Sequence, residues 1–435
     1  MTFPPSRHHA VAIFLVAFAA HVMFFLVMQT RYPEWQPEDI PRNGWFTIAE
    51  NLAAGRGYTA NHLLTYFPTT RPVPTAARGP LPVLFLAAFI TLFSNPYYPI
   101  LIATWLLSAG NALLAYAVIL KVARDRRLAL VGGLLTGLHL SEMYVNTTFS
   151  YCSEPLFMHL LGWTVLLAIM TIERGRTWMA VATGACLGAA CLARPTVLLL
   201  PAVVIGFFVA TRRGSGARLA AVACVAFALV QVPWVWRNQV VFHRTVLTST
   251  LSGYGLYTAA VAARDGDIHL SGWSIDRVKL WNDMRSELAA VNLSVNGVDE
   301  VEFDIVLNRA ARAIIAKNLS TYVKNVALGA VGIWYWTNSG RGLYLVQNAI
   351  YYALALVGLV VAVRRREWVL LSLLVLPAYA VAMHMPFVPQ YRYMLPFTPY
   401  VFAFTGLGLM WLVDRCRTHF DRGDRPVAPS TPISI

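Results

Sequence analysis

About ten apolar segments of roughly 20 residues recur along this 435-residue chain, and clusters of basic residues follow every second segment. A segment of this length can cross the hydrocarbon core of a membrane as an α-helix, in which every backbone polar group is hydrogen-bonded internally. Hydrophobic residues make up 57% of the chain and charged residues only 13%, which excludes a soluble domain with a wetted surface. The sequence therefore predicts an all-α polytopic membrane protein. The predicted spans are 10–29, 99–120, 128–146, 155–172, 177–193, 196–211, 218–236, 343–363, 368–385 and 395–413.

The basic clusters predict the orientation of these spans. They are Lys121/Arg124/Arg126/Arg127, Arg174/Arg176, Arg212/Arg213/Arg218, Arg364/Arg365/Arg366 and Arg415/Arg417/Arg422/Arg425. Because cytoplasmic loops carry an excess of Lys and Arg, we expect all five clusters and both termini on the cytoplasmic side of the plasma (inner) membrane. The formal charge of +14 arises largely beside apolar segments, where orienting the spans is its ordinary role, and this disfavours a nucleic-acid partner.

Two further apolar stretches, 80–94 and 322–336, would disturb this alternation if they crossed the membrane. Both are short for a crossing, and the aromatic residues Tyr97, Tyr98, Trp334 and Trp336 at their ends favour the membrane interface. We therefore expect two helices that lie along the outer membrane surface. The alternative is a pair of true spans with a charge rule that is only weakly obeyed.

This topology divides the chain into three regions. Residues 1–236 form an N-terminal transmembrane module with the first external loop, 30–98, and residues 343–435 form C-terminal transmembrane helices and a cytoplasmic tail. Between them, 237–342 is an external region of amphipathic and interfacial helices. The two external regions hold most of the acidic residues and most of the irregular sequence rich in Pro, Trp and Tyr. The functional site is therefore expected on the external face.

Local patterns predict some of the packing. Small residues at Gly133/Gly137 and Gly184/Gly188 allow helix backbones to approach closely. A helix is expected at about 43–54, ending at Gly55. An amphipathic helix is expected at about 299–317, and its apolar side is assigned to Val301, Ile305, Ala311, Ile314 and Ile315.

Six short motifs occur in a fixed order across about 350 residues. They are Ala49-Glu-Asn-Leu52 with Gly55-Arg-Gly-Tyr58, Arg78-Gly-Pro80, Ser153-Glu-Pro155, Leu192-Ala-Arg-Pro195, Pro233-Trp-Val-Trp-Arg-Asn238 and Arg392-Tyr-Met-Leu-Pro396. Through them the chain resembles the membrane glycosyltransferases of the GT-C class, specifically family 39. That family includes the dolichyl-phosphate-mannose protein mannosyltransferases and the lipid A aminoarabinose transferase.

The resemblance implies an enzyme that moves a monosaccharide from a polyprenyl-phosphate carrier to a lipid, glycan or protein acceptor on the non-cytoplasmic side, with inversion. The family's catalytic base is an acidic residue of the first external loop, which here falls on Asp39, with Glu38 as its neighbour. The chain departs from the family pattern, because four positions before the aromatic Trp45 stands Pro41. Assigning Asp39 as the base therefore needs a shift of two residues.

The resemblance also implies a second acidic residue in the active cavity, here Glu154, which is a candidate to position the acceptor or to hold a divalent cation together with Asp39. No cofactor is otherwise implied. The developing charge on the departing phosphate needs fixed cations. Arg78, Arg237 and Arg392 abut apolar segments on the external side and are the candidates, with Tyr393 beside the last. The alternative for each arginine is a snorkelling residue at headgroup level.

Three further polar residues lie near or within the spans. His139 and Glu142 could form an internal pair, and His384 is either packed or part of a site. At the level of function, a polysaccharide ligase or polymerase with the same carrier chemistry remains open. A polytopic transporter is a more distant alternative, because the candidate polar residues gather on one face and no internal repeat is evident.

Overall fold

The computed structural model describes residues 7–37, 44–63, 67–148, 153–266, 276–295, 298–334, 342–388 and 390–423. Within these ranges the regular secondary structure is helical, apart from one antiparallel hairpin of β1 (Thr59–Leu63) and β2 (Phe67–Pro74). Seven helical segments are long and apolar enough to cross a membrane. They are 7–31, 97–123, 126–148, 154–174, 216–242, 344–364 and 391–417. The all-α polytopic fold predicted from the sequence is confirmed.

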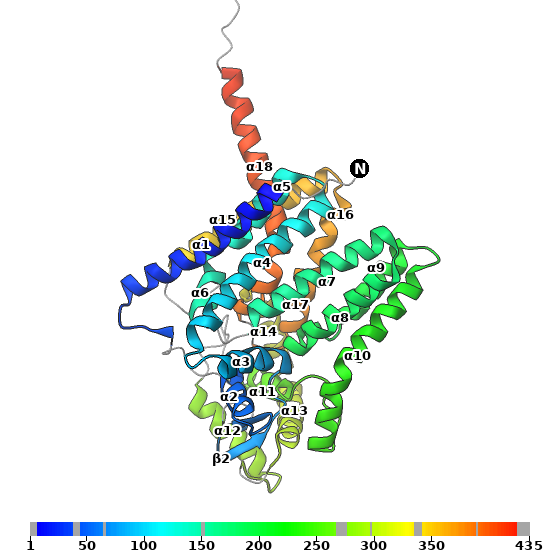
Figure 1. Cartoon of the computed structure of the whole chain (residues 1–435). Helices are drawn as coiled ribbons and strands as arrows, with labels where there is room; N and C mark the ends of the chain where they lie inside the picture. The colour runs from blue at the N-terminus through cyan, green and yellow to red at the C-terminus, as the bar shows by residue number, and fades with distance from the viewer. Residues whose placement is uncertain are drawn as a thin grey trace, which may run out of the picture.

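These segments and several shorter helices form a bundle (Figure 1). Its helices are α1 (Arg7–Arg31), α4 (Tyr97–Ala123), α5 (Arg126–Gly137), α6 (Leu140–Thr148), α7 (Glu154–Arg174), α8 (Thr177–Ala193), α9 (Leu200–Thr211), α10 (Gly216–Phe242), α15 (Gly342–Arg364), α16 (Trp368–Leu371), α17 (Val375–His384) and α18 (Thr398–Gly423). Three predicted spans, at 177–193, 196–211 and 368–385, correspond to shorter apolar helices of 10–17 residues. Of these, 196–211 and 368–385 contain 3₁₀ turns, at Pro195–Val197 and Ser372–Leu374.

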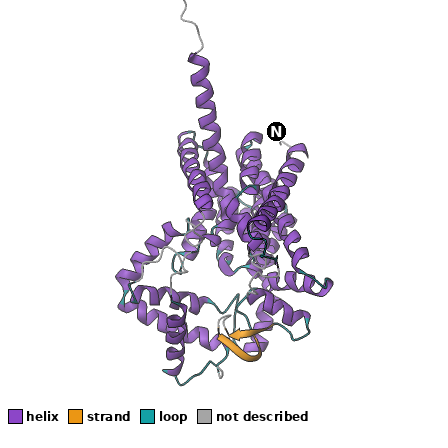
Figure 2. Cartoon of the chain, turned by 90° about the vertical axis from the view of Figure 1, so that its left-hand side faces the viewer, coloured by secondary structure: helices purple, strands orange, loops and turns teal. Residues whose placement is uncertain are grey.

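The remaining elements form a second layer at one end of the bundle (Figures 1 and 2). They are the hairpin, α2 (Gly44–Ala53), α3 (Pro80–Leu92), α11 (Ser252–Arg264), α12 (Arg277–Ala289), α13 (Glu300–Lys317) and α14 (Leu319–Gly332). This layer has apolar clusters of its own: α11, α12 and α13 enclose one with Leu63 and Phe67 of the hairpin, while α2 and α3 enclose another. We call it the loop layer.

Successive long helices run in opposite directions, so the first four basic clusters, together with Arg415 and Arg417 of the fifth, come to the end of the bundle that carries the N-terminus and the projecting end of α18 (Figure 1). Contacts between helix ends agree with this arrangement. Lys121 Nζ lies 2.6 Å from Glu173 Oε2, and Arg212 donates hydrogen bonds to the carbonyls of Ile172 and Glu173. The loop layer lies at the opposite end. The fold therefore places the basic clusters and the loop layer at opposite ends of the bundle.

The predicted close helix contacts are confirmed. A Cβ atom built on Gly184 would lie 2.0 Å from the Ala223 carbonyl oxygen of α10, and one built on Gly137 would lie 2.6 Å from Cβ of Ala17 in α1. Helix backbones thus touch at both positions, and any larger side chain would force the helices apart.

The span predicted at 128–146 is matched by the segment 126–148, which is long and apolar enough to cross a membrane although α5 ends at Gly137 and α6 begins at Leu140. One local prediction is wrong in part. The amphipathic helix exists as α13, but Ile305 faces solvent with 41% of its surface exposed, while Phe303 and Leu307 are fully buried. The apolar side was misassigned because α13 packs against α11 and the hairpin, which share a core with Phe303 and Leu307.

The two short apolar stretches are helices that end before a full crossing. α3 has 13 residues and α14 has 14, and neither is among the seven segments long enough to span. In Figure 1, α3 runs crosswise to α4, beneath the bundle. The expectation that both lie along the membrane surface stays a prediction.

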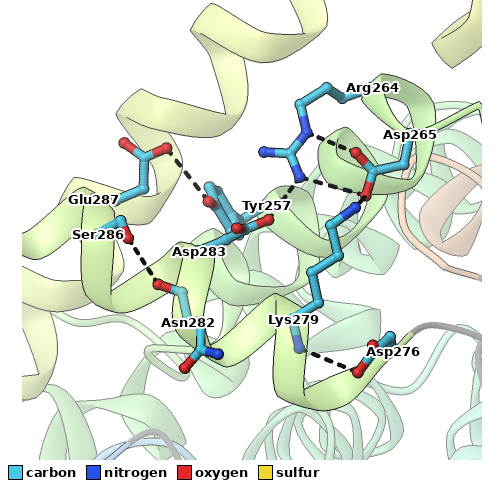
Figure 3. Close-up of polar contacts among 9 residues, drawn as sticks. All are labelled: Tyr257, Arg264, Asp265, Asp276, Lys279, Asn282, Asp283, Ser286 and Glu287. Atoms are coloured by element: carbon cyan, nitrogen blue, oxygen red, sulfur yellow. Dashed lines mark hydrogen bonds and ion pairs between the residues drawn. The ribbon is translucent and has the colours of Figure 1, made fainter.

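An exposed set of ion pairs joins α11 to α12 (Figure 3). Arg264 pairs with Asp265 at 2.8 Å and with Asp283 at 2.6 Å, and Lys279 pairs with Asp265 at 2.5 Å. We call these four residues the surface network. Tyr257 Oη also donates to Glu287 Oε1, at 3.3 Å, and fastens the same two helices.

Candidate functional site

Glu154 is the first residue of α7 and is buried, with only 3% of its surface exposed. Pro155 suits the first turn of this helix, because its missing N–H would have no helical partner there. Glu154 Oε1 lies 3.2 Å from Nη1 of Arg194 and 4.0 Å from Nε of Arg392. We call these three residues the buried cluster. One carboxylate faces two guanidinium groups, so the cluster carries a net positive charge.

Arg194 stands at the end of α8, at the edge of the loop layer. Pro195 disfavours helical backbone in the residue before it, and Arg194 is extended, with φ −146° and ψ 125°. Its guanidinium lies 5.2 Å from the ring centre of Tyr393 and 5.8 Å from that of Phe157. Aromatic rings beside a guanidinium stabilise it and restrict its motion. Arg194 was not among the candidates from the sequence, although it lies in one of the quoted motifs.

Arg392 and Tyr393 lie on a 3₁₀ turn, Tyr391–Tyr393, that precedes α18. Arg392 Nε donates to Gln390 Oε1 at 2.8 Å, and its guanidinium lies 5.4 Å from the Tyr393 ring centre. The same ring also stacks on His384, with 4.9 Å between the ring centres. His384 also lies 3.3 Å from Thr196 Oγ1 and is thereby joined to the turn after Arg194. The structure thus places His384 next to the buried cluster.

A buried polar network connects the 3₁₀ turn at Tyr391–Tyr393 to residues of the bundle. Tyr391 Oη lies 3.1 Å from His139 Nε2 and donates to Asn348 Oδ1 at 3.1 Å, and His139 and Asn348 are 3.0 Å apart. Glu142 does not pair with His139; its Oε1 accepts a hydrogen bond from Asn146 Nδ2 at 3.4 Å. The internal pair considered from the sequence is therefore wrong, because His139 lies against Asn348 and Tyr391, whereas Glu142 accepts a hydrogen bond from Asn146.

Arg78 lies where two of the sequence motifs meet. A Cβ atom on Gly79 would be 2.2 Å from the Leu192 carbonyl oxygen, so the Arg78-Gly-Pro80 backbone packs directly on the end of α8 that leads to Arg194. The Arg78 guanidinium stacks over Trp45, at 4.0 Å from the ring centre. Tyr58 Oη donates to the Arg78 carbonyl at 2.8 Å and fixes this backbone further.

Arg237, near the end of α10, binds backbone of the loop layer. It donates to the carbonyls of Thr75 at 2.8 Å and Tyr58 at 2.9 Å, and to Asn238 Oδ1 at 2.9 Å. Its guanidinium also lies 5.2 Å from the Tyr58 ring centre. Unlike Arg194 and Arg392, it makes no ion pair with Glu154 within the described residues. Its observed contacts attach the hairpin region to α10.

Glu300 is a second buried carboxylate that sequence reasoning missed. Its side chain, 1% exposed, accepts hydrogen bonds from Thr75 Oγ1 at 2.6 Å, from the Ala76 N–H at 2.8 Å and from Thr250 Oγ1. It joins the start of α13 to the segment that leads from β2 to Arg78. Its partners lie 50 and 225 positions away, so no local pattern indicates them.

The predicted base, Asp39, and its neighbour Glu38 lie outside the described residues, and their role stays a prediction. The described chain resumes at Gly44, and the next residue is Trp45, the ring beneath Arg78. Among the described residues, no group of three or more His, Cys, Asp or Glu could hold a metal ion. Glu154 is also a poor cation ligand in this arrangement, because both adjacent guanidinium groups would repel the metal.

No protein-family model and no curated protein matches this chain. Solved structures do. The archaeal oligosaccharyltransferase AglB from Archaeoglobus fulgidus, in complex with an inhibitory peptide and a dolichol-phosphate, matches with a TM-score of 0.57 at 14% identity, over 97% of this chain and 52% of that one. An oligosaccharyltransferase from Archaeoglobus fulgidus in the apo form matches with a TM-score of 0.55, also at 14% identity, over 96% of this chain and 52% of that one.

ArnT from Cupriavidus metallidurans, bound to undecaprenyl phosphate, is similar over 98% of this chain and 81% of its own length, at 13% identity and a TM-score of 0.36. This chain spans about half the length of the archaeal enzyme. The likeness to that enzyme confirms, at the level of the fold, that the chain has the helical membrane architecture of the GT-C glycosyltransferases.

Proposed function

We propose that this protein is a membrane glycosyltransferase that moves a sugar from a polyprenyl-phosphate carrier to a lipid, glycan or protein acceptor. The observation that carries the proposal is the buried cluster, in which Glu154 holds two arginines at the junction of the bundle and the loop layer. The fold supports it, since AglB, which shares this architecture, is an oligosaccharyltransferase described with a dolichol-phosphate.

The cluster suits a leaving phosphate. When the bond between the anomeric carbon and the phosphate oxygen breaks, negative charge collects on the phosphate, and fixed cations lower the barrier if they are in place beforehand. Arg194 and Arg392 share one carboxylate, so the pair keeps about one uncompensated positive charge for that phosphate. Guanidinium groups also match phosphate oxygens in a bidentate geometry. Glu154 acts as the positioning residue that holds both arginines.

The remaining parts come from the loop layer. Arg78, whose backbone packs on the end of α8, is a further candidate for the phosphate, and Arg237 positions this region through Tyr58 and Thr75. Asp39 takes the proton from the acceptor as the acceptor attacks the anomeric carbon from the face opposite the phosphate, so the configuration is inverted. Glu38 is the alternative base.

Consumption of a polyprenyl-phosphate sugar by the full chain in lipid vesicles tests this function. A panel of hexose, pentose and aminosugar donors covers the unknown sugar, lipid, glycan and peptide acceptors are supplied with each donor, and release of free polyprenyl phosphate is measured. Asp39→Asn should abolish release, and Arg194→Gln should slow it about 100-fold. Lys279→Gln, in the exposed surface network, is the matched control and should leave the rate unchanged. Wild-type rates in both site variants, or a wild type that consumes no donor, would refute the proposal.

The same proposal places the loop layer on the non-cytoplasmic side. Arg71 in the hairpin and Arg126 at the start of α5 are both exposed and lie at opposite ends of the bundle. In a cysteine-depleted chain, a membrane-impermeant thiol reagent added to intact cells should label Arg71→Cys and spare Arg126→Cys. The reverse pattern would invert the orientation and move the site to the cytoplasmic face.

A further inference from the structure

A groove of about 420 Å³ opens between α15 and α18 at the end of the bundle that carries the basic clusters, opposite the end that holds the buried cluster. Val357, Val360 and Val361 of α15 line its apolar part, together with Trp411 of α18. Arg364 and Arg365, which follow the valines, and Arg415, one turn after Trp411, line the rest. The lining therefore changes from hydrocarbon to guanidinium along the helix axes.

Two glycines explain why the groove opens at this level. A Cβ atom on Gly358 would lie 1.9 Å from the Phe404 carbonyl oxygen, and one on Gly408 would lie 2.0 Å from that of Leu354. The two helix backbones are thus in direct contact there. Beyond this contact, towards the basic end, the helices carry the larger side chains of Val361 and Trp411. The groove lies beside this tightly packed crossing, so the packing of α15 against α18 fixes its position.

The arginines of the groove are arranged to bind an anion. The Arg415 guanidinium lies over Trp411, at 5.0 Å from the ring centre, and Arg364 and Arg365 are exposed at the end of α15. Three guanidinium groups on one groove attract a phosphate and can bind its oxygens in a bidentate geometry. The valines beside them belong to a segment apolar enough to cross a membrane, 344–364. A ligand that fills the groove must therefore combine an anionic head with a hydrocarbon chain.

We propose that this groove binds an anionic membrane phospholipid, with its phosphate on Arg364, Arg365 and Arg415 and one acyl chain along Val357 and Val360. Free inorganic phosphate would leave the valines without a partner. Basic pockets between membrane helices at the headgroup level recognise anionic lipids by the same combination of charge and apolar wall. The site is independent of the proposed sugar transfer, because it lies at the other end of the bundle and shares no residue with the buried cluster.

Native mass spectrometry of the full chain in mild detergent, titrated with phosphatidylglycerol or phosphatidylcholine, tests the proposal. The wild type should retain phosphatidylglycerol at concentrations where phosphatidylcholine is lost. The triple variant Arg364→Gln/Arg365→Gln/Arg415→Gln should weaken this binding at least about tenfold, since each lost charge-assisted hydrogen bond has a cost of that order. Arg174→Gln/Arg176→Gln removes charge from another cluster at the same end and should leave binding unchanged.

A second variant tests the acyl chain separately from the charge. Val360 is half-exposed, so Val360→Phe narrows the apolar part of the groove without disturbing the buried core and should also weaken phosphatidylglycerol binding. Unchanged binding in Val360→Phe would mean that surface charge alone attracts the lipid, and would overturn the proposal that an acyl chain lies in the groove. Equal losses in the triple variant and in the Arg174/Arg176 control, or no preference for the anionic lipid in the wild type, would overturn the proposal as well.

Discussion

The buried cluster and the surface network contain the same kinds of charge, but they differ in solvent exposure. In the buried cluster the side chains of Glu154 and Arg194 are 4% and 11% exposed. In the surface network those of Arg264 and Lys279 are 34% and 54% exposed, although their distances to carboxylates are shorter. Distance alone would rank the surface pairs as the stronger interactions. Exposure reverses that order, because water and salt screen the surface pairs.

The comparison supports the role proposed for the buried cluster. Removing Glu154 and its arginines from water costs several kcal/mol for each ion, and their mutual attraction offsets that cost only in part. A well-packed apolar core would serve stability at least as well. The surface network needs little desolvation and stabilises the contact of α11 with α12 modestly. The buried cluster is therefore explained by what it can bind better than by stability.

Among the residues of the buried cluster and the surface network, Arg194→Gln should have the largest effect, because it leaves Glu154 buried with only the more distant Arg392. Removing one partner of a buried pair costs about 3 kcal/mol in the free energy of unfolding, measured by denaturation in detergent. The transfer rate should fall about 100-fold. Lys279→Gln breaks a shorter pair and should change neither quantity by comparable amounts. Equal effects of the two variants would erase the distinction between buried and surface pairs.

Arg392→Gln should have a smaller effect on stability than Arg194→Gln. Its Nε lies 4.0 Å from Glu154 and its side chain is 25% exposed, so less desolvated charge is left behind. We expect a loss of about 1 kcal/mol in the free energy of unfolding and about a tenfold loss in transfer rate. Arg392→Lys keeps the charge without the planar fork and should recover part of the activity. If Arg392→Gln were more damaging than Arg194→Gln, the assigned order of the two arginines would be wrong.

The bundle is predictable from the sequence because span length, basic clusters and small-residue spacing are local signals. Gly184 and Gly137 are examples, since the pattern that indicated them needs only five consecutive positions. The same signals fail where the fold depends on distant partners. Ile305 was placed on the apolar side of α13 because its periodicity fits, whereas the packing of α13 against α11 decides that Phe303 and Leu307 are buried.

In the candidate site, too, local signals predicted some residues, whereas contacts between distant positions hid others. The motifs predicted Glu154, Arg392 and Tyr393, which the structure brings together. Arg194 was missed because its contact with Glu154 joins positions 40 residues apart. One signal could have revealed it, since Arg194 lies at the end of the bundle away from the basic clusters, where the orientation of the spans does not account for an arginine. Glu300 offers no such signal, because its position at the start of a helix is ordinary for an acidic residue.

Asp304 shows how burial within the loop layer changes the pKa of a carboxyl group. Burial raises its pKa to about 6, although Ser252 and the N–H of Gly253 donate hydrogen bonds to it. Because the pKa in the folded state is higher than the unfolded value near 4, the folded protein binds this proton more tightly. Its stabilising contribution is complete below about pH 4 and is lost as the pH rises through 6.

The loss should amount to about 2 kcal/mol in the free energy of unfolding between pH 4 and 7. Asp304→Asn should flatten this part of the pH profile, measured by thermal unfolding of the full chain at fixed ionic strength. Glu302→Gln, a change of the same kind on the same helix, is the control and should keep the slope. An unchanged slope in Asp304→Asn would mean that another group titrates there.

Asp265 should give the smallest effect and the opposite sign. The hydrogen bond from Arg264, followed by that from Lys279, lowers the pKa of this carboxyl group. A lowered pKa means that the unfolded chain binds the proton more tightly, so the contribution is present above about pH 4 and is lost as the pH falls further. Asp265→Asn should therefore reduce the free energy of unfolding by only about 0.5 kcal/mol at neutral pH, and molar salt should remove most of that difference. A loss as large as that of Arg194→Gln, or one that persists in high salt, would show that the surface network is not screened by solvent and would remove the reason for ranking it below the buried cluster.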